Sequence, residues 1–159
     1  MTTTTTLRQI DDFLALKRIA VVGVSRNPKE ISYTLWQELR QRRYDAVPVN
    51  PSATEIDGVP CFASVAGIVP PVEGALIVTT AAVAEQVLEQ CAAAGIRKVW
   101  LYGGLGGGAT NDATVRAAER LGLEAVSGLC PYMFLPGTPA FHAMHAWGKK
   151  LTGSYPKAG

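Results

Sequence analysis

Short apolar runs alternate with amphipathic segments along most of the chain. The apolar runs, each typical of a strand buried on both faces of a parallel sheet, cover residues 19–24, 45–50, 75–80, 98–102 and 123–126. Helical spacing of apolar residues marks the segments between several of these runs: 31–43, 81–94 and 110–121. This order predicts an α/β fold, a three-layer, doubly wound parallel sheet of about five to six strands.

Two further segments complete the predicted elements. Apolar residues from Leu7 to Leu16 recur at near-helical spacing, so we expect an N-terminal helix that lies across the sheet. Val59 to Phe62 is a short apolar segment between turn-rich stretches and is expected to form an additional short strand. Right-handed crossovers would then bring the carboxyl ends of all the parallel strands to one edge, where ligands bind in such sheets.

The turn after the first apolar run has the composition of an anion-binding loop. It reads GVSRNP from Gly23 to Pro28 and leads into the helix predicted from Ile31. The first turn of a helix leaves backbone N–H groups unpaired, and the helix dipole favours an anion there. A glycine would let the backbone approach a phosphate. A buried strand that ends in an ordinary turn fits the same residues, so the loop alone does not separate the two interpretations.

Length and charge limit the classes of protein to consider. With 159 residues, 48% apolar residues and a net charge of +2, the chain is typical of one globular domain without a basic surface for nucleic acid. No apolar run approaches the roughly 20 residues of a membrane span, and no signal peptide is evident. We therefore expect a single domain over 1–159, with residues 1–6 disordered and a C-terminal helix over 138–151.

The cysteines indicate the compartment. Cys61, Cys91 and Cys130 are odd in number and scattered, without the CxxC spacing of a zinc site. Such an arrangement fits reduced thiols better than disulfides, which predicts a cytoplasmic protein. No nucleic-acid or membrane partner is expected, and a homodimer would be ordinary for a domain of this kind.

Two common nucleotide fingerprints are missing. A dinucleotide-binding loop reads GxGxxG, whereas only the first glycine, Gly23, stands in this sequence. An acidic residue should follow the second strand to accept the ribose hydroxyls, but Asn50 and Pro51 stand there. The GxxxxGK[ST] loop of ATP-hydrolysing enzymes is also absent. NAD and this type of ATP hydrolysis are therefore not expected.

The order of the remaining motifs resembles that of a known family. The motifs are VVGVSRNP, Ser32 in the following helix, PVNP, the Gly58–Phe62 segment, the VTT strand end, VWLYGG and the late GLCPYMFLP. From about Asp11 to Pro136 the chain is similar to the small CoA-binding proteins with a Rossmann-like fold. These are related to the nucleotide-binding domain of the succinyl-CoA synthetase alpha chain.

The resemblance implies a binding site for coenzyme A or an acyl-CoA across the strand ends. Gly23, Val24 and Ser25 would hold the diphosphate, Val49, Asn50 and Pro51 would flank the adenosine, and Thr79 and Thr80 would line the opposite side. Arg26 or Lys29 would pair with a phosphate. The full set of expected ligand-binding residues is Gly23, Val24, Ser25, Arg26, Asn27, Pro28, Ser32, Val49, Asn50, Pro51, Thr79, Thr80, Gly103 and Cys130.

No catalytic or metal-binding constellation is evident in the sequence. His142 and His145 lie three residues apart, without a third ligand, and packing within a helix explains them more simply than metal binding. Cys130 is either a buried strand-end cysteine or a thiol that forms a mixed disulfide with CoA. The glycine run from Gly103 to Gly108 is either a second anion-binding loop or a flexible turn before a helix.

The sequence thus predicts a protein that binds CoA or an acyl-CoA at the carboxyl edge of a parallel sheet and carries, senses or delivers it without catalysis. Two alternatives stay open. One is an enzyme dependent on NAD(P) or CoA that uses the same cleft. The other is a protein-interaction module in which the cleft is vestigial and a helix near Phe141–Trp147 docks another chain.

Overall fold

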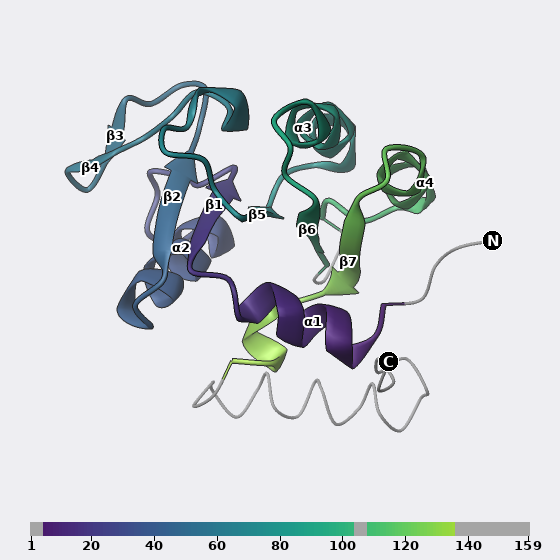
Figure 1. Cartoon of the computed structure of the whole chain (residues 1–159). Coiled ribbons are helices and arrows are strands. Elements are labelled where there is room, and N and C mark those ends of the chain that lie inside the picture. The colour runs from purple at the N-terminus through teal and green to yellow at the C-terminus, as the bar shows by residue number, and fades with distance from the viewer. Residues whose placement is uncertain (1–4, 104–107, 136–159) are drawn as a thin grey trace.

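A parallel sheet forms the middle layer of the fold (Figure 1). The computed structural model describes residues 5–103 and 108–135, and within them the sheet has five strands in the order β2-β1-β5-β6-β7. The strands are β1 (Arg18–Val22), β2 (Asp45–Val49), β5 (Gly74–Ile77), β6 (Lys98–Tyr102) and β7 (Glu124–Leu129). The chain winds from β1 to β2 in one direction and then from β5 to β7 in the other. The winding therefore reverses between β1 and β5, and the strand ends there form the topological switch point where such sheets bind ligands.

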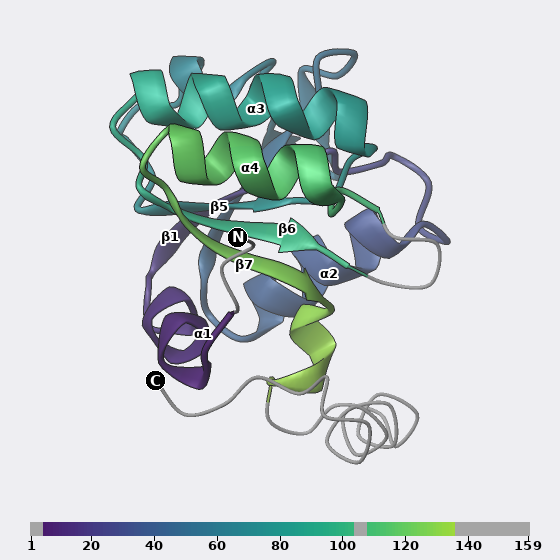
Figure 2. The same ribbon diagram turned by 90° about the vertical axis from the view of Figure 1, so that its right-hand side faces the viewer.

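Helices cover both faces of the sheet, which confirms the predicted three layers (Figure 2). On one face lie α1 (Leu7–Leu14) and α2 (Ile31–Gln41), and on the other α3 (Ala81–Ala93) and α4 (Asp112–Arg120). Strand side chains alternate between these layers: Ile19 packs with the α1 and α2 side, and Ala20 with the α3 and α4 side. Burial on both faces explains why the strands read as continuous apolar runs.

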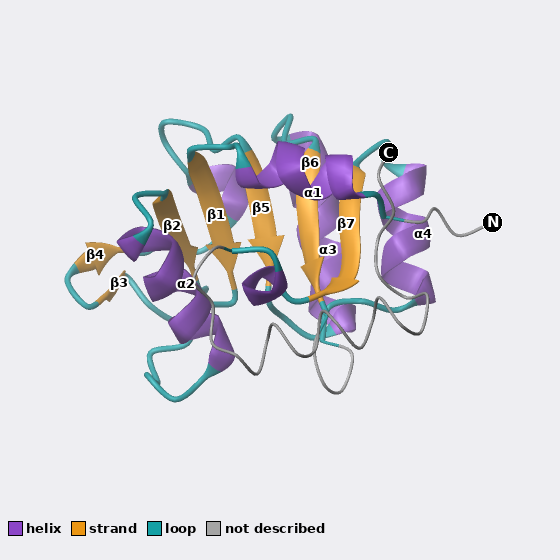
Figure 3. Cartoon of the chain, turned by 90° about the horizontal axis from the view of Figure 1, so that it is seen from below, coloured by secondary structure: helices purple, strands orange, loops and turns teal. Residues whose placement is uncertain are grey.

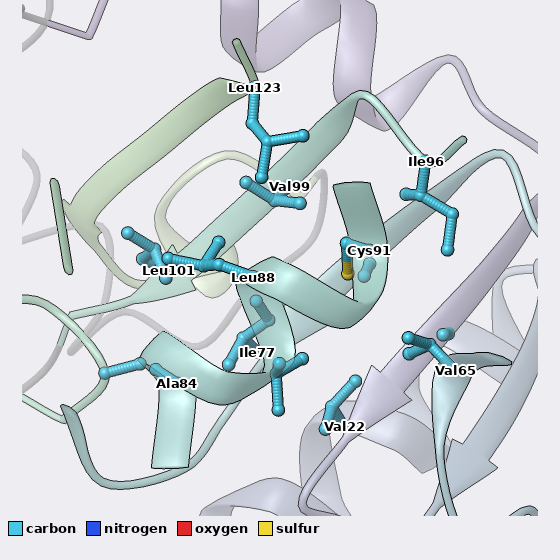
Figure 4. Close-up of a cluster of buried hydrophobic side chains, with 14 of the residues drawn as sticks. Val22, Val65, Ile77, Ala84, Leu88, Cys91, Ile96, Val99, Leu101 and Leu123 are labelled. Carbon is cyan, nitrogen blue, oxygen red and sulfur yellow. The ribbon is translucent and has the colours of Figure 1, made fainter. Parts of the chain in front are cut away.

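The layer beneath α3 is formed almost entirely by aliphatic side chains (Figure 4). Val22, Ile77 and Leu101 from three strands pack in one cluster with Leu88 and Cys91 of α3. Burial raises the pKa of the Cys91 thiol to about 12, so this cysteine is a protonated packing residue at neutral pH.

Two tryptophans anchor the opposite layer. Trp36 and Trp100 are fully buried, and the indole N–H groups donate to the carbonyl oxygens of Ala46 (2.9 Å) and Leu129 (3.0 Å) respectively. Phe13 of α1 packs edge-on against Trp100 with ring centroids 5.5 Å apart. A buried tryptophan contributes apolar area, and the hydrogen bond of its N–H fixes the orientation of the ring. These contacts therefore hold α1 and α2 on the sheet.

The threonines at the start of the described chain correct one expectation. Thr5 and Thr6 were expected to be disordered, but the Thr6 hydroxyl caps α1 by accepting from the N–H of Gln9 (3.2 Å). The Thr5 hydroxyl accepts from the N–H of Ser127 on β7 (3.1 Å). A hydroxyl that satisfies an unpaired backbone N–H gives these residues the fixed position that composition alone did not indicate.

The short strand expected over Val59–Phe62 forms at Val59–Pro60, outside the main sheet. Val59–Pro60 forms β4, which pairs antiparallel with β3 (Glu55–Ile56) in a separate hairpin beside β2 (Figure 3). Phe62 returns to the sheet only as an isolated parallel bridge to Val49. Asp57 and Gly58 both have positive φ angles, 52° and 76°, which is the conformation that a tight hairpin turn requires. This turn reverses the chain before a parallel strand can form.

Short 3₁₀ turns complete the described elements: η1 (Val65–Gly67) packs against α3, and η2 (Pro131–Met133) follows β7. The helix expected over 138–151, with His142, His145, Phe141 and Trp147, lies outside the described residues, as do residues 104–107 of the glycine run. The single-domain prediction stays a prediction.

Candidate functional site

Gly23 lies at the switch point, where the ends of β1, β2 and β5 meet. The N–H of Gly23 donates to the carbonyl oxygen of Val49 (2.9 Å), and the residue has a φ of +95°. A Cβ at this position would lie 2.4 Å from the carbonyl oxygen of Val78 and 2.9 Å from Cγ2 of Thr79. Only glycine allows both this backbone conformation and this close approach, so the first glycine of the loop is required by the fold itself.

Side-chain hydrogen bonds shape the loop that follows. The N–H of Ser25 donates to the buried hydroxyl of Ser32 (3.0 Å), and the Ser25 hydroxyl accepts from the N–H of Asn27 (3.0 Å). The side-chain oxygen of Asn27 accepts from the N–H of Lys29 (3.0 Å). Ser32, one of the expected ligand-binding residues, holds the loop against the helix through this bond, and its role in ligand binding stays a prediction. Glu30, not Ser32, is the N-cap residue.

The first turn of α2 is open to an anion. The N-cap residue Glu30 makes no side-chain hydrogen bond to it, so the first N–H groups of the helix have no side-chain cap. Arg26 and Lys29 are exposed beside this turn and form no ion pair within the residues that the structure describes. Unpaired amides, a helix dipole and two free cations are the features with which proteins bind phosphate groups.

A cavity of about 260 Å³ opens beside Gly23, between the switch point and α3. The lining residues are Val22, Gly23, Val49, Pro51, Ala63, Ser64, Thr79, Val83, Gln86, Val87 and Gln90. Four of them, Gly23, Val49, Pro51 and Thr79, are among the expected ligand-binding residues. The wall is mostly apolar with a few polar side chains, as in many small-molecule sites.

The side chains of Asn50 and Thr80 form hydrogen bonds within the protein beside this site. The Asn50 side chain donates from Nδ2 to the carbonyl oxygen of Val24 (2.9 Å) and accepts at Oδ1 from the N–H of Ser52 (2.8 Å). Asn50 thereby ties the end of β2 to the loop after β1. The Thr80 hydroxyl caps α3 by accepting from the N–H of Val83 (3.5 Å). Val24 itself is fully buried on the α1 and α2 side.

Among the described residues, the ends of β6 and β7 pack directly on each other, and we call this the closed end of the edge. A Cβ on Gly103 would lie 2.3 Å from the carbonyl carbon of Gly128, so the two backbones are in direct contact. The Thr110 hydroxyl donates to the carbonyl oxygen of Leu101 (2.9 Å) and accepts from the N–H of Gly128 (3.0 Å). The absence of a side chain at Gly103 is thus explained by strand packing.

Cys130 lies in this closed region, buried in the cluster on the α1 and α2 side of the sheet and not in the wall of the cavity. Burial raises the pKa of its thiol, although contacts with Tyr132 and Tyr102 partly offset this effect. Burial and the neighbouring Cys130 raise the pKa of Tyr102 to about 12. Both groups are therefore protonated at neutral pH, and a raised thiol pKa works against the thiolate that disulfide exchange requires.

Comparison with protein families settles what kind of domain carries this cavity. A family model described as a CoA binding domain matches residues 17–136, which includes the whole sheet. The chain belongs to the CoA-binding domain family. The family predicted from VVGVSRNP, PVNP and the later motifs is thereby confirmed, together with the Rossmann-like fold.

Curated relatives of this CoA-binding domain are parts of larger ligases. An ADP-forming acetate–CoA ligase from Archaeoglobus fulgidus is 31% identical over 120 residues, which are 72% of this chain and 18% of that protein. The corresponding ligase from Methanocaldococcus jannaschii is 30% identical over 81 residues, 51% of this chain and 12% of that protein. The chain spans between 12% and 20% of the length of the curated relatives that it matches.

Solved structures include relatives of similar size. A conserved hypothetical protein from Pyrococcus furiosus has a TM-score of 0.66 and 31% identity, covering 72% of this chain and 95% of that one. A dinucleotide-forming acetyl-coenzyme A synthetase from Ca. Korarchaeum cryptofilum, in complex with phosphate and ADP, has a TM-score of 0.59 and 26% identity. The match covers 69% of this chain and 25% of the synthetase chain.

Sequence reasoning missed the α3 side of the CoA-binding domain's cavity. Val83, Gln86 and Gln90 form this side, and Ala63 and Ser64, which precede η1, line another part of the cavity; none of the five was expected to bind a ligand. Residues 83, 86, 87 and 90 follow the spacing of one helix face, and the helix begins directly after the β5 strand end. That spacing was a signal available in the sequence.

No group of three or more His, Cys, Asp or Glu side chains within 5–103 and 108–135 is placed to hold a metal ion. None of the helices in the same part of the chain is long and apolar enough to cross a membrane.

Proposed function

We propose that this chain binds coenzyme A, or an acyl-CoA, at the carboxyl edge of its sheet and holds the ligand without transforming it. The observation that carries the proposal is the cavity at the β1–β5 switch point, in a domain of the CoA-binding family. Ligands of doubly wound sheets bind at this point because the flanking loops there diverge and leave a crevice.

Each part of the nucleotide has a matching surface. The diphosphate lies against the loop from Gly23 to Asn27 and the uncapped first turn of α2, where backbone N–H groups and the helix dipole favour an anion. Arg26 and Lys29 supply positive charge for the diphosphate and the 3′-phosphate. The adenosine enters the cavity between Val49, Pro51 and α3.

Two exposed apolar side chains fit a ligand at this edge. Ile31 and Val83, which are 36% and 45% exposed, belong to the first turns of α2 and α3, the two helices that begin at the site. Val83 also lines the cavity. A bound nucleotide that covers these side chains removes their apolar surface from water, which favours the complex.

The polar side chains that line the cavity suit binding rather than chemistry. They are the hydroxyls of Ser64 and Thr79 and the carboxamides of Gln86 and Gln90. Hydroxyls and carboxamides form hydrogen bonds with a ligand, but neither group titrates near neutral pH as a general acid or base does. This chemistry supports a protein that senses, carries or delivers CoA.

A second candidate function is that of a CoA-binding component within an acyl-CoA ligase assembled from several parts. The observation that favours it is the set of curated relatives, which are ADP-forming acetate–CoA ligases. In this case the other reacting groups come from a partner chain. Ligase activity that appears only on mixing with a co-purifying protein would distinguish this candidate from the binding-only function.

Thermal melting with CoA tests the proposed function. A ligand that binds only the folded state at 100 times its Kd adds about 2.7 kcal/mol, which raises the Tm of a domain this size by about 5–10 °C. We expect this shift with CoA, but not with NAD at the same millimolar concentration, because Asn50 stands where NAD-binding sheets have an acidic residue. A shift with NAD alone, or no shift with CoA or acetyl-CoA, would overturn the proposal.

A further inference from the structure

Gln86 and Gln90 are the two carboxamides in the wall of the cavity, and both come from α3. They lie four residues apart, so one face of the helix presents them to the same groove, about 6 Å from each other along the axis. Within the described residues neither side chain has a hydrogen-bond partner, although a carboxamide offers two donors and an acceptor. These groups are therefore available to a ligand.

The rest of the wall favours a flat, neutral, largely apolar group. Val49, Pro51, Val83 and Val87 provide apolar contacts on both sides, and no charged side chain is among the described residues of the lining. Val87, between the two glutamines on α3, also lines the cavity and is 5% exposed. A purine base matches this environment, with its faces against aliphatic side chains and its polar edge towards the carboxamides.

We propose that Gln86 and Gln90 read the edge of the adenine base and make the site selective for adenine nucleotides. This inference rests on the proposed function, because it takes the adenosine of CoA as the occupant of the cavity. A carboxamide pairs with adenine by accepting from the N6 amino group and donating to an adjacent ring nitrogen. The keto oxygen and N7 of guanine pair best with Arg or Lys, which this wall lacks among its described residues.

The two glutamines contribute unequally. Gln90 is half-buried and lies one turn further along α3 from the strand ends, whereas Gln86 is exposed at the rim. The ribose enters from the Gly23 side, so the N6 edge of the base, which points away from the ribose, reaches Gln90. Since hydrogen bonds strengthen as water is excluded, Gln90 has the larger effect on selectivity.

The ratio of two affinities tests this inference. Titration calorimetry of the full chain compares CoA with 1,N6-etheno-CoA, in which the N1 and N6 positions of the base are blocked. The unmodified protein should bind CoA about tenfold more tightly than the etheno analogue, as expected for one bidentate contact. Gln90→Leu and Gln90→Glu should reduce this ratio to near one, and Gln86→Leu should reduce it by less.

Glu85→Leu is the matched control, because Glu85 is exposed on the same helix and is not part of the cavity wall. It should keep the ratio of the unmodified protein even if the overall affinity changes with the lost charge. If the protein binds CoA but the Gln90 variants keep the affinity ratio of the unmodified protein, the base-reading role is wrong and the proposed function stands. If it binds neither ligand, the proposed function is wrong as well.

Discussion

The carboxyl edge of the sheet has two halves with opposite properties. At the β1–β5 end a cavity of about 260 Å³ opens beside Gly23, and the first turn of α2 has no side-chain cap. At the β6–β7 end the Gly103 and Gly128 backbones touch, and the Thr110 hydroxyl satisfies backbone groups of both strands. The same edge thus leaves polar groups available at one end and pairs them at the other.

This difference separates two reasons for glycine at a strand end. Gly23 and Gly103 both follow an apolar strand, and a side chain at either would collide with backbone atoms at 2.4 Å and 2.3 Å respectively. Gly23 in addition lines the cavity described above, and Gly103 is not among its lining residues. A glycine after a strand therefore indicates close backbone packing in both cases, and a ligand site only where the neighbouring strands diverge.

Replacing these two glycines should give the largest effects. We expect Gly23→Ala to lower the free energy of unfolding by about 3 kcal/mol or more, because a positive φ and a backbone clash act together. Gly103→Ala should lower it by about 2–3 kcal/mol through the clash alone. Denaturant unfolding measures both values.

CoA affinity at low temperature then separates the two halves of the edge. Gly23→Ala should weaken binding by more than about tenfold, because its Cβ collides with the Val78 carbonyl and with Thr79, which lines the cavity. Folded Gly103→Ala protein should bind within about twofold of the unmodified protein, given the modest backbone shifts expected. Equal losses of affinity would contradict the distinction between an open and a closed end.

A pair of hydroxyl deletions gives an intermediate effect. Ser32→Ala leaves the N–H of Ser25 unpaired, and Thr110→Val does the same for the N–H of Gly128. Each substitution should lower the free energy of unfolding by about 1–2 kcal/mol, because the amide N–H loses its hydrogen bond and water replaces that bond only in part. Only Ser32→Ala should also weaken CoA binding, by about fivefold, because Ser25 belongs to the phosphate-binding loop. If Thr110→Val weakened CoA binding more, the closed end would be part of the site.

The smallest expected effect is on protein stability at alkaline pH, and it comes from Tyr102 at the closed end. The pKa of Tyr102 rises from 10.0 to about 12 on folding, so the folded state holds this proton more tightly than the unfolded chain. The stability that this provides is complete below pH 10 and is lost as the pH rises towards 12. The Tyr102→Phe variant should lose less of its unfolding free energy over this pH range than the unmodified protein. Because Tyr102 is half-exposed, we expect the difference to be up to about 1 kcal/mol. Identical pH profiles for both proteins would show that the phenol is not shielded.

The main elements were predictable because their patterns are local. The buried strand near Ile19, the helix from Ile31 and the strand Lys98–Tyr102 follow from apolar periodicity, and the structure confirms them within a few residues. The β3–β4 hairpin was not expected, since it depends on Asp57 and Gly58 adopting positive φ angles. An Asp-Gly pair is a recognised hairpin signal, but flanking strands of two residues are too short to show alternation.

Only part of the candidate site was predictable, because its other contacts are long-range. Gly23, Val49, Pro51 and Thr79 stand at strand ends, and topology alone brings them to one cavity. The hydrogen bond from Asn50 to Val24 joins residues 26 positions apart, so no local pattern shows that this amide supports the wall. Cys130 likewise is buried in a cluster that also contains residues of α1 and α2, which are far from it in the sequence. Its expected role in ligand binding stays a prediction.

The position of α1 has a consequence for the synthesis of the chain. This helix is synthesised before the strands on which it packs: Phe13 packs on Trp100, and the Thr5 hydroxyl is bonded to Ser127, 122 residues further along. At about 5–20 residues per second, the ribosome needs roughly 6–24 s to supply that last strand. During this interval the nascent helix lacks its native contacts with β6 and β7, so a chaperone that binds emerging chains would have a long opportunity to bind its apolar face.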